Sequence, residues 1–247
     1  MAKEKIYFAS DFHLGVPDYG SSLLREKKVV AWLDKVKGDA AEIYLVGDIF
    51  DFWFEYKYTA PKGFTRLLGK IAEITDSGTP VHVFTGNHDM WLFDYLPKEI
   101  GIILHHAPIE KIYGGKSFLI GHGDGLGPGD GWYKFLKKIF ANKLCQWLFA
   151  RIHPNLAFAI AHYFSRKSRI ATGNSDSKYL GDDKEWLVIY CREKLKEKHF
   201  DYFVFGHRHL PIEVKLNEKS TYINLGEWVN YYSFAEFDGT LHLKKFE

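Results

Sequence analysis

The 247-residue sequence has few cysteines and no long apolar run. Its two cysteines, Cys145 and Cys191, lie far apart, which excludes a disulfide framework or a thiolate zinc motif and predicts packed, reduced thiols. No apolar stretch reaches the roughly 18 residues that a membrane span needs. The amino terminus has no signal-peptide core, so we expect a cytoplasmic protein. A net charge of +2 is too small to indicate nucleic acid as a specific partner.

Acidic residues are also missing from one long segment. Between Gly131 and Ser175 there is no Asp or Glu, although Lys and Arg recur there together with Trp and Phe. The helical spacing of the apolar residues predicts a helical cap inserted at residues 131–198, between core segments 1–130 and 199–247. A basic, aromatic cap suits an amphipathic lipid that carries phosphate. The alternative is that the aromatic side chains only pack the helices together and the lysines are solvated.

Short runs rich in β-branched and aromatic residues predict buried strands. They lie at 5–10, 42–46, 81–85, 117–120 and 202–205. Helical patterns separate the first three strands and predict an α/β core; they lie at 23–36 and 64–75. Alternating stretches near the carboxyl-terminal end predict a β meander; they lie at 212–216, 221–224, 231–237 and 241–246.

A glycine pair raises the question of a phosphate-binding loop. Gly114-Gly115-Lys116-Ser117 is similar to the last part of such a loop, but Glu110 stands where its first glycine should be. We therefore expect a hairpin turn at this point.

Polar side chains that can bind metals follow each of the five predicted core strands. They are Asp11 and His13, Asp48 and Asp51, Asn87 and His88, His122, and His207 and His209. Loops at the carboxyl ends of strands in α/β sheets converge on one crevice, so we expect these side chains to meet. One such fragment alone would ordinarily be a turn or a helix cap, but five in this position predict a shared site.

The donor atoms indicate what the site holds. Imidazole nitrogens with carboxylate and amide oxygens suit Mn²⁺, Fe²⁺ or Zn²⁺. The candidate ligands exceed the needs of one tetrahedral ion and predict two ions about 3.5–4 Å apart that share a carboxylate; they are Asp11, His13, Asp48, Asn87, His122, His207 and His209. No nucleophile elbow or Cys–His signature is present, so metal-activated water is the expected nucleophile.

The motif series D-x-H, G-D-x-x-D, G-N-H-D, G-H and G-H-x-H resembles that of the calcineurin-like dimetal phosphoesterases. The resemblance implies an α/β metallophosphoesterase fold, a four-layer sandwich of two β-sheets flanked by helices, with an inserted helical cap. It implies that one ion is held by Asp11, His13, Asp48 and His209, and the other by Asp48, Asn87, His122 and His207. It also implies that His88 is a catalytic residue that contacts the scissile phosphate and that Asp51 orients it.

The Gly47–Trp53 stretch and the helical insertion are similar to the UDP-2,3-diacylglucosamine hydrolases of lipid A synthesis. This resemblance implies cleavage of UDP-2,3-diacylglucosamine to UMP and 2,3-diacylglucosamine 1-phosphate, with two Mn²⁺ ions, by a protein peripheral to the cytoplasmic face of the inner membrane. The implied substrate contacts are Asn87, His88, Asp130, Asn174, Lys178 and His207. Well-known members carry Arg where this chain has His88. A phosphodiesterase or phosphatase acting on a non-lipid phosphoester therefore stays open as the alternative, and so does the oligomeric state.

Overall fold

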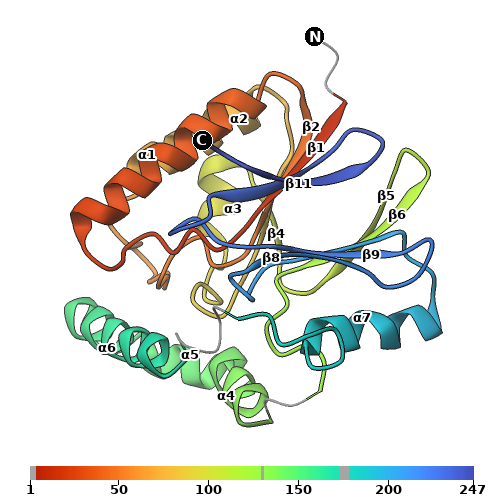
Figure 1. The fold of residues 1–247 in the computed structure, drawn as a ribbon. Helices are drawn as coiled ribbons and strands as arrows, with labels where there is room; N and C mark the ends of the chain where they lie inside the picture. Colours follow the sequence, from red (N-terminus) through yellow and green to blue (C-terminus); the bar gives the residue numbers. More distant parts are fainter. Residues whose placement is uncertain (1–3, 129–130, 173–177) are drawn as a thin grey trace.

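The computed structural model describes residues 4–128, 131–172 and 178–247. Two β-sheets pack face to face, and helices cover their outer faces, so the core has four layers (Figure 1). This is the sandwich that the resemblance to the calcineurin-like phosphoesterases implies.

The first sheet is six-stranded, in the order β11-β10-β1-β2-β3-β4. Its bounds are β1 Lys5–Ala9, β2 Ala40–Val46, β3 Val81–Phe84, β4 Ile103–His105, β10 Ser233–Phe237 and β11 Leu241–Lys245. β1 to β4 are parallel, whereas β10 is antiparallel to β1 and to β11. Parallel neighbours require crossover connections between them, as the alternation of strand and helix patterns predicts.

The second sheet is five-stranded, in the order β5-β6-β7-β9-β8. Its bounds are β5 Ile109–Tyr113, β6 Lys116–Gly121, β7 Tyr202–Phe205, β8 Pro211–Lys215 and β9 Thr221–Leu225. β6, β7 and β9 are parallel, and the two edge strands are antiparallel to their neighbours. Gly114 and Gly115, with φ of +54° and +77°, form the predicted hairpin turn between β5 and β6.

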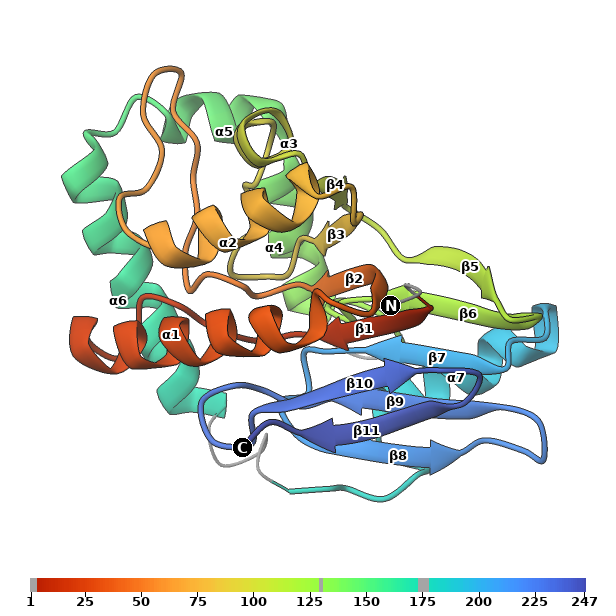
Figure 2. The same ribbon diagram turned by 90° about the horizontal axis from the view of Figure 1, so that it is seen from above.

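The helices of the described chain form two groups. The core helices are α1 Tyr19–Val36, α2 Thr65–Asp76, the short α3 Tyr95–Ile100 and α7 Trp186–Glu197. The helices that we call the cap helices are α4 Gly131–Ala141, α5 Lys143–Phe149 and α6 Pro154–Thr172. Figure 2 shows α5 and α6 beside one end of the sheets, whereas the β5–β6 hairpin lies at the other end. Among the described residues, no helix combines the length and the hydrophobicity required to span a bilayer.

The period of two along each strand explains the layers. In β1, Tyr7 and Ala9 face the cluster that α1 and α2 cover, whereas Ile6 and Phe8 face the second sheet. Because both faces of these strands are buried, their sequences read as continuous apolar runs, which is why they were predictable. On the outer face of the second sheet, the buried side chains of α7, among them Cys191, pack against the strands. In the described part of the predicted insertion at 131–198, α7 packs against the second sheet, whereas α4, α5 and α6 do not belong to that layer.

The prediction of a β meander at the carboxyl-terminal end is wrong. β8 and β9 form a hairpin in the second sheet, whereas β10 and β11 form a hairpin in the first. β9 pairs with β7 and β10 pairs with β1, so the chain changes sheets between them. The alternating pattern correctly placed the strands, but a pairing partner far along the chain determines the sheet to which each hairpin belongs.

Candidate metal centre

The backbone conformation at the strand ends singles out the predicted ligands. Non-glycine residues with positive φ are uncommon and cost of order 1 kcal/mol or more, so they persist mainly at functional sites. The described candidate ligands that adopt it are Asp11 at 57°, His13 at 44°, Asp48 at 51°, His207 at 67° and His209 at 55°. The strain is evidence for function that does not depend on the sequence motifs.

One cluster of ligand atoms forms where β1, β2 and β7 end. Its members are Asp11, His13, Asp48 and His209. The Nε2 atoms of His13 and His209 lie 3.0 Å apart, and His209 Nε2 lies 3.2 Å from Asp11 Oδ1. These ligand atoms come from both sheets and lie close to one another. The cluster can therefore hold a single cation.

A second cluster adjoins the first and shares Asp48 with it. Its members are Asp48, His122 and His207. His122 Nε2 lies 3.4 Å from Asp48 Oδ2 and 3.3 Å from Asn87 Oδ1. The structure thus brings all seven candidate ligands together in two sets joined by one carboxylate.

The hydrogen bonds in these clusters leave some of the possible metal-ligand atoms without a hydrogen-bond partner. Asp48 Oδ1 accepts the backbone N–H of His88 at 2.9 Å, and Asp11 Oδ2 accepts that of His207 at 3.0 Å. Among the described residues, Asp48 Oδ2, Asp11 Oδ1 and His207 Nδ1 are buried with no hydrogen-bond partner. An unpartnered buried carboxylate oxygen is costly, and a divalent cation removes that cost. The residues therefore fit two divalent ions.

The orientation of His122 also suits a ligand. Its Nδ1–H donates to the carbonyl of Val46 at 2.8 Å, which leaves Nε2 directed at Asp48. Burial alone would lower the pKa of His122, but the Asp48 carboxylate outweighs burial and raises it to about 10, so a cation bound at Nε2 would take the place of a proton there. Burial and the neighbouring His122 lower the pKa of His207 to about 4, so this ring is neutral at pH 7. Burial would raise the pKa of Asp48, but His122, His88 and His13 hold it well below its usual value.

Two glycines allow the backbone to approach these carboxylates closely. A Cβ atom on Gly86 would lie 2.1 Å from Asp48 Oδ1, and one on Gly206 would lie 2.5 Å from Asp11 Oδ2. No side chain fits at either position, which explains why glycine precedes the ligand motifs there.

His88 lies beside the first cluster and contacts Asp51, the residue that the resemblance pairs with it. The His88 Nδ1–H donates to the backbone carbonyl of Asp51 at 3.0 Å, and the Asp51 carboxylate lies 3.5 Å away. The rings of His13 and His88 meet edge to face with centroids 4.9 Å apart. His88 Nε2 is thereby left for a group bound at the metal centre.

The cap contributes two residues to this region that sequence reasoning missed. Ser165 of α6 donates its hydroxyl to both carboxylate oxygens of Asp51, at 2.9 and 3.0 Å. His162, one turn earlier on the same helix, has its Nδ1 3.6 Å from Asp51 Oδ2. Nothing in their local sequence singles them out, because the contact joins residues more than a hundred positions apart.

Two further buried ionisable residues hold the ligand loops, and sequence reasoning assigned neither of them a role. Asp89 accepts the backbone N–H groups of Gly86 at 2.7 Å and of Ile49 at 2.8 Å, which ties together the loops that follow β3 and β2. Arg208, between the two histidines, forms a buried ion pair with Glu185 at 3.0 Å. Asp89 stands within G-N-H-D, so a signal for it was present in the sequence.

The predicted substrate contacts are less completely placed. Asp130 and Asn174 lie outside the described residues. Lys178 is exposed, and its backbone carbonyl accepts a hydrogen bond from Arg208, so it stands next to the loop that carries His207 and His209. Asp124, two residues after His122, is paired with Lys137 at 2.6 Å and so ties α4 to the site.

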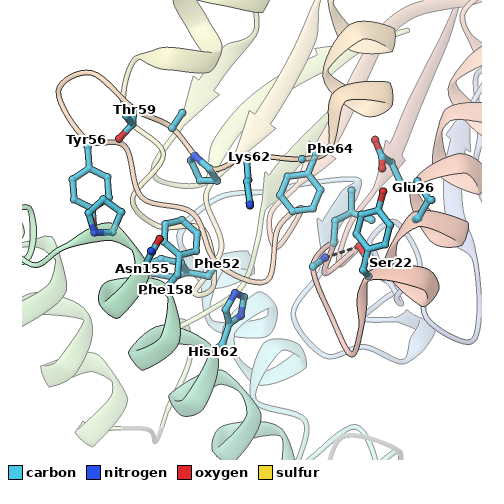
Figure 3. Close-up of a pocket in the computed structure, with 18 residues that line it drawn as sticks. Ser22, Glu26, Phe52, Tyr56, Thr59, Lys62, Phe64, Asn155, Phe158 and His162 are labelled. Carbon is cyan, nitrogen blue, oxygen red and sulfur yellow. Dashed lines mark hydrogen bonds between the residues drawn. The ribbon is translucent and has the colours of Figure 1, made fainter.

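A cavity of about 810 Å³ opens between α1, the loop at 52–64 and α6. Its walls are largely apolar, and Figure 3 shows Phe52, Phe158 and His162 close together in it. Lys62 lies near the centre of this view, above His162 of α6. Because His162 both lines the cavity and approaches Asp51, the cavity adjoins the metal centre.

Comparison with known proteins agrees with this geometry. Residues 4–211 match the calcineurin-like phosphoesterase family. The chain belongs to that family. This calcineurin-like phosphoesterase is 39% identical to the UDP-2,3-diacylglucosamine hydrolase of Porphyromonas gingivalis, with 96% of this chain and 95% of that protein covered. It is 26% identical to the UDP-2,3-diacylglucosamine hydrolase of Actinobacillus succinogenes, with 94% and 95% covered.

Among solved structures, a phosphoesterase from E. coli is 14% identical, with a TM-score of 0.48 and coverage of 98% of this chain and 92% of that chain. The family match and the two ligand clusters together make this calcineurin-like phosphoesterase a hydrolase with a divalent-metal centre.

Proposed function

We propose that this enzyme hydrolyses the diphosphate of UDP-2,3-diacylglucosamine to UMP and 2,3-diacylglucosamine 1-phosphate, a step of lipid A synthesis. The observation that carries the proposal is a largely apolar cavity of about 810 Å³ beside a polar metal centre. A substrate with a diphosphate and acyl chains needs both surfaces side by side. The full-length likeness to the hydrolase of Porphyromonas gingivalis supports the same substrate.

The proposed metal sites follow the two clusters. We assign one ion to Asp11, His13, Asp48 and His209, and the other to Asp48, Asn87, His122 and His207, with Mn²⁺ as the ion. When bound, two such ions lower the pKa of a bound water to about 7 and neutralise phosphoryl charge. The protonation states of the proposed ligands suit these ions: Asp48 stays ionised, and His207 presents a neutral ring nitrogen.

His88 is assigned the contact with the scissile phosphate. Its Nδ1–H is fixed on the Asp51 carbonyl, so only Nε2 is left to bond a phosphoryl or leaving-group oxygen. Asp51 acts as the positioning residue, and Ser165 ties it to the cap. Asn87, Asp130, Asn174, Lys178 and His207 are the further proposed substrate contacts.

The proposed place of work is the cytoplasmic face of the inner membrane, with the enzyme bound peripherally. The acyl chains of such a substrate lie in a bilayer, whereas its UDP group lies in water. An enzyme that cleaves the diphosphate therefore works at the boundary between the two.

The decisive experiment measures UMP release from UDP-2,3-diacylglucosamine with and without Mn²⁺, beside release of p-nitrophenol from bis-p-nitrophenyl phosphate. We expect UMP only when Mn²⁺ is present. Hydrolysis of the nitrophenyl ester with no UMP release would replace the proposal with a phosphoesterase acting on a non-lipid substrate.

The Asp48→Asn variant tests the shared carboxylate. It keeps an oxygen that accepts the His88 N–H but removes the charge that both clusters share. We expect turnover to fall by roughly 1,000-fold or more, because the electrostatic contribution of such a centre is several kcal/mol. The matched control is Asp183→Asn, which removes a 94% exposed carboxylate that pairs with Arg192 and belongs to neither cluster. Equal activity of Asp48→Asn and wild type would rule out the two-metal assignment.

A further inference from the structure

Helix α5 presents an apolar face to solvent. Leu144, Trp147 and Leu148 are 63%, 53% and 53% exposed. Their spacing of three and four residues places them on one side of the helix. Phe149, on another side, packs against the core, with its ring 4.6 Å from Trp91 and 4.8 Å from Phe54. The helix is therefore anchored by one aromatic side chain while its apolar face has no cover among the described residues.

The border of this face is positively charged. Lys143 begins the helix, and Arg151 lies over the Trp147 ring with its guanidinium 4.4 Å from the ring centre. The sequence has no Asp or Glu between Gly131 and Ser175. Exposed Trp and Leu bordered by Lys and Arg match the interface of an anionic bilayer, where rings and aliphatic chains enter the acyl boundary and cations meet phosphates.

The position of α5 also supports a bilayer as the partner of this apolar face. The helix leads through residues 150–153 into Pro154 and Asn155, which line the cavity beside the metal centre. Tyr56, from the opposite wall of that cavity, donates its hydroxyl to the carbonyl of Ile152 at 3.4 Å. The apolar face thus lies next to the wall of the cavity, where an acyl chain would pass between a bilayer and the protein.

We propose that α5 docks on the surface of an anionic phospholipid bilayer through Leu144, Trp147 and Leu148, with Lys143 and Arg151 contacting lipid phosphates. The proposal rests on the proposed function only for the reason to dock, since the surface itself is read from exposure and charge. A second copy of the chain is the competing occupant of such a face, but Lys143 and Arg151 at its border repel an identical face and attract anionic lipid.

The test is co-sedimentation with vesicles of phosphatidylcholine alone and with vesicles that also contain phosphatidylglycerol. We expect wild-type protein to bind the anionic vesicles, less at high salt, and to bind the neutral vesicles weakly. The double variant Trp147→Ser, Leu148→Ser should bind roughly 10-fold or more weakly, because two apolar side chains no longer leave water. The matched control is Ile112→Ser, which removes a 74% exposed apolar residue on β5, outside the cap.

Two further measurements keep the outcomes distinct. Turnover of bis-p-nitrophenyl phosphate should be unchanged in the double variant, which shows that it is folded. Unchanged vesicle binding by this variant, or equal loss in Ile112→Ser, would overturn the proposal. A wild-type dimer that becomes monomeric in the double variant, with no vesicle binding, would assign the face to a second copy instead.

Failure of the docking proposal differs from failure of the proposed function. UMP release from detergent-dispersed substrate by a wild-type enzyme that binds no vesicles would leave the function standing and end the docking proposal. Vesicle binding without UMP release would support the docking proposal and overturn the proposed function.

Discussion

Gly86 shows how tightly the metal centre is built at the scale of single residues. A Cβ atom there would lie 2.1 Å from Asp48 Oδ1 and 2.7 Å from the Asp48 backbone nitrogen. The carboxylate that both clusters share is thus held by the absence of a side chain as well as by hydrogen bonds. Gly69, on α2, provides the contrast, since nothing lies within 4 Å of a Cβ atom at that position.

We expect Gly86→Ala to lower turnover by roughly 100-fold, because displacing a catalytic group by about 1 Å has an effect of that size. Gly69→Ala should leave turnover unchanged and stabilise the protein by about 0.5–1 kcal/mol, because alanine is the better helix former. Steady-state kinetics and thermal melting of both variants check this. Wild-type kinetics in Gly86→Ala would mean that Asp48 has room to move.

A second prediction at this scale concerns Ser165. Its hydroxyl joins α6 to Asp51, so Ser165→Ala should raise the KM for the acylated substrate about 5-fold through loss of about 1 kcal/mol. Affinity for Mn²⁺ should be unchanged, because Ser165 contacts none of the proposed ligands. Ser165→Thr keeps a hydroxyl and should restore the wild-type KM. If both variants show the same KM change, the hydroxyl is not the cause.

The candidate ligands were predictable because each follows a buried strand within a short motif. Asp11 and His13, for example, stand two residues apart directly after β1. Ser165 and Arg208 were not predictable, because their roles come from contacts with Asp51 and Glu185 that only the tertiary structure creates. Local sequence carries the chemistry of a ligand but not the identity of the residue that positions it.

At the scale of elements, α2 begins without a capping side chain of its own. Phe64 precedes it in the left-handed conformation, and the backbone N–H groups of Arg66 and Leu67 bond instead to Glu26 of α1, at 2.9 and 3.1 Å. A buried carboxylate at a helix N-terminus is favourable both as an acceptor and as a charge. This cap explains why the sequence predicts the helix at 64–75 by its period and not by a start signal.

A polar cluster links β2 and β3 with β5, away from the metal centre. Glu42 Oε2 accepts the hydroxyls of Tyr44 at 2.8 Å and Tyr113 at 2.7 Å, and lies 2.9 Å from His82 Nε2. Burial alone would raise the pKa of Glu42, but these hydrogen bonds outweigh it and lower the pKa from 4.5 to about 2. A folded pKa below the unfolded one means that ionised Glu42 stabilises the fold above pH 4.5.

We expect this stabilisation, on the order of 2 kcal/mol, to disappear as the pH falls from about 4.5 to about 2. Glu42→Gln should therefore be less stable than wild type at pH 7 and should lose less stability over that interval. Urea unfolding of the metal-free proteins at several pH values measures the difference. Parallel pH profiles for the two proteins would contradict the assignment.

The two carboxyl-terminal hairpins mark the limit of sequence reasoning about elements. The Asp238-Gly239 signal correctly predicts that β10 and β11 pair, because short turns are encoded locally, and the loop between Phe237 and Leu241 has three residues. The partner of β10 across the sheet is β1, more than two hundred residues away, and no local pattern encodes it. The short β4 was missed for a related reason, since three residues carry too little periodicity.

At the scale of the whole molecule, the metal centre joins the two sheets. Asp11, His13, Asp48 and Asn87 follow strands of the first sheet, whereas His122, His207 and His209 follow strands of the second. An ion in either cluster thus cross-links the layers and stabilises the native fold, because the unfolded chain has no such site.

We expect Mn²⁺ at about 100 times its dissociation constant to stabilise the protein by about 2.7 kcal/mol and to raise the melting temperature by roughly 5–10 °C. Asp48→Asn should show a much smaller rise, while Asp183→Asn should match the wild type. Thermal melting with and without Mn²⁺ after chelation checks this. An equal rise in Asp48→Asn would mean that the stabilising ion binds elsewhere.

His13 and His209 touch across 196 positions of the chain, and His207, which completes the other cluster, is two residues earlier. During synthesis, the amino-terminal ligands leave the ribosome long before these two histidines do. Neither ligand set is complete until the loop after β7 has emerged. Full coordination of an ion is accordingly a property of the nearly finished chain.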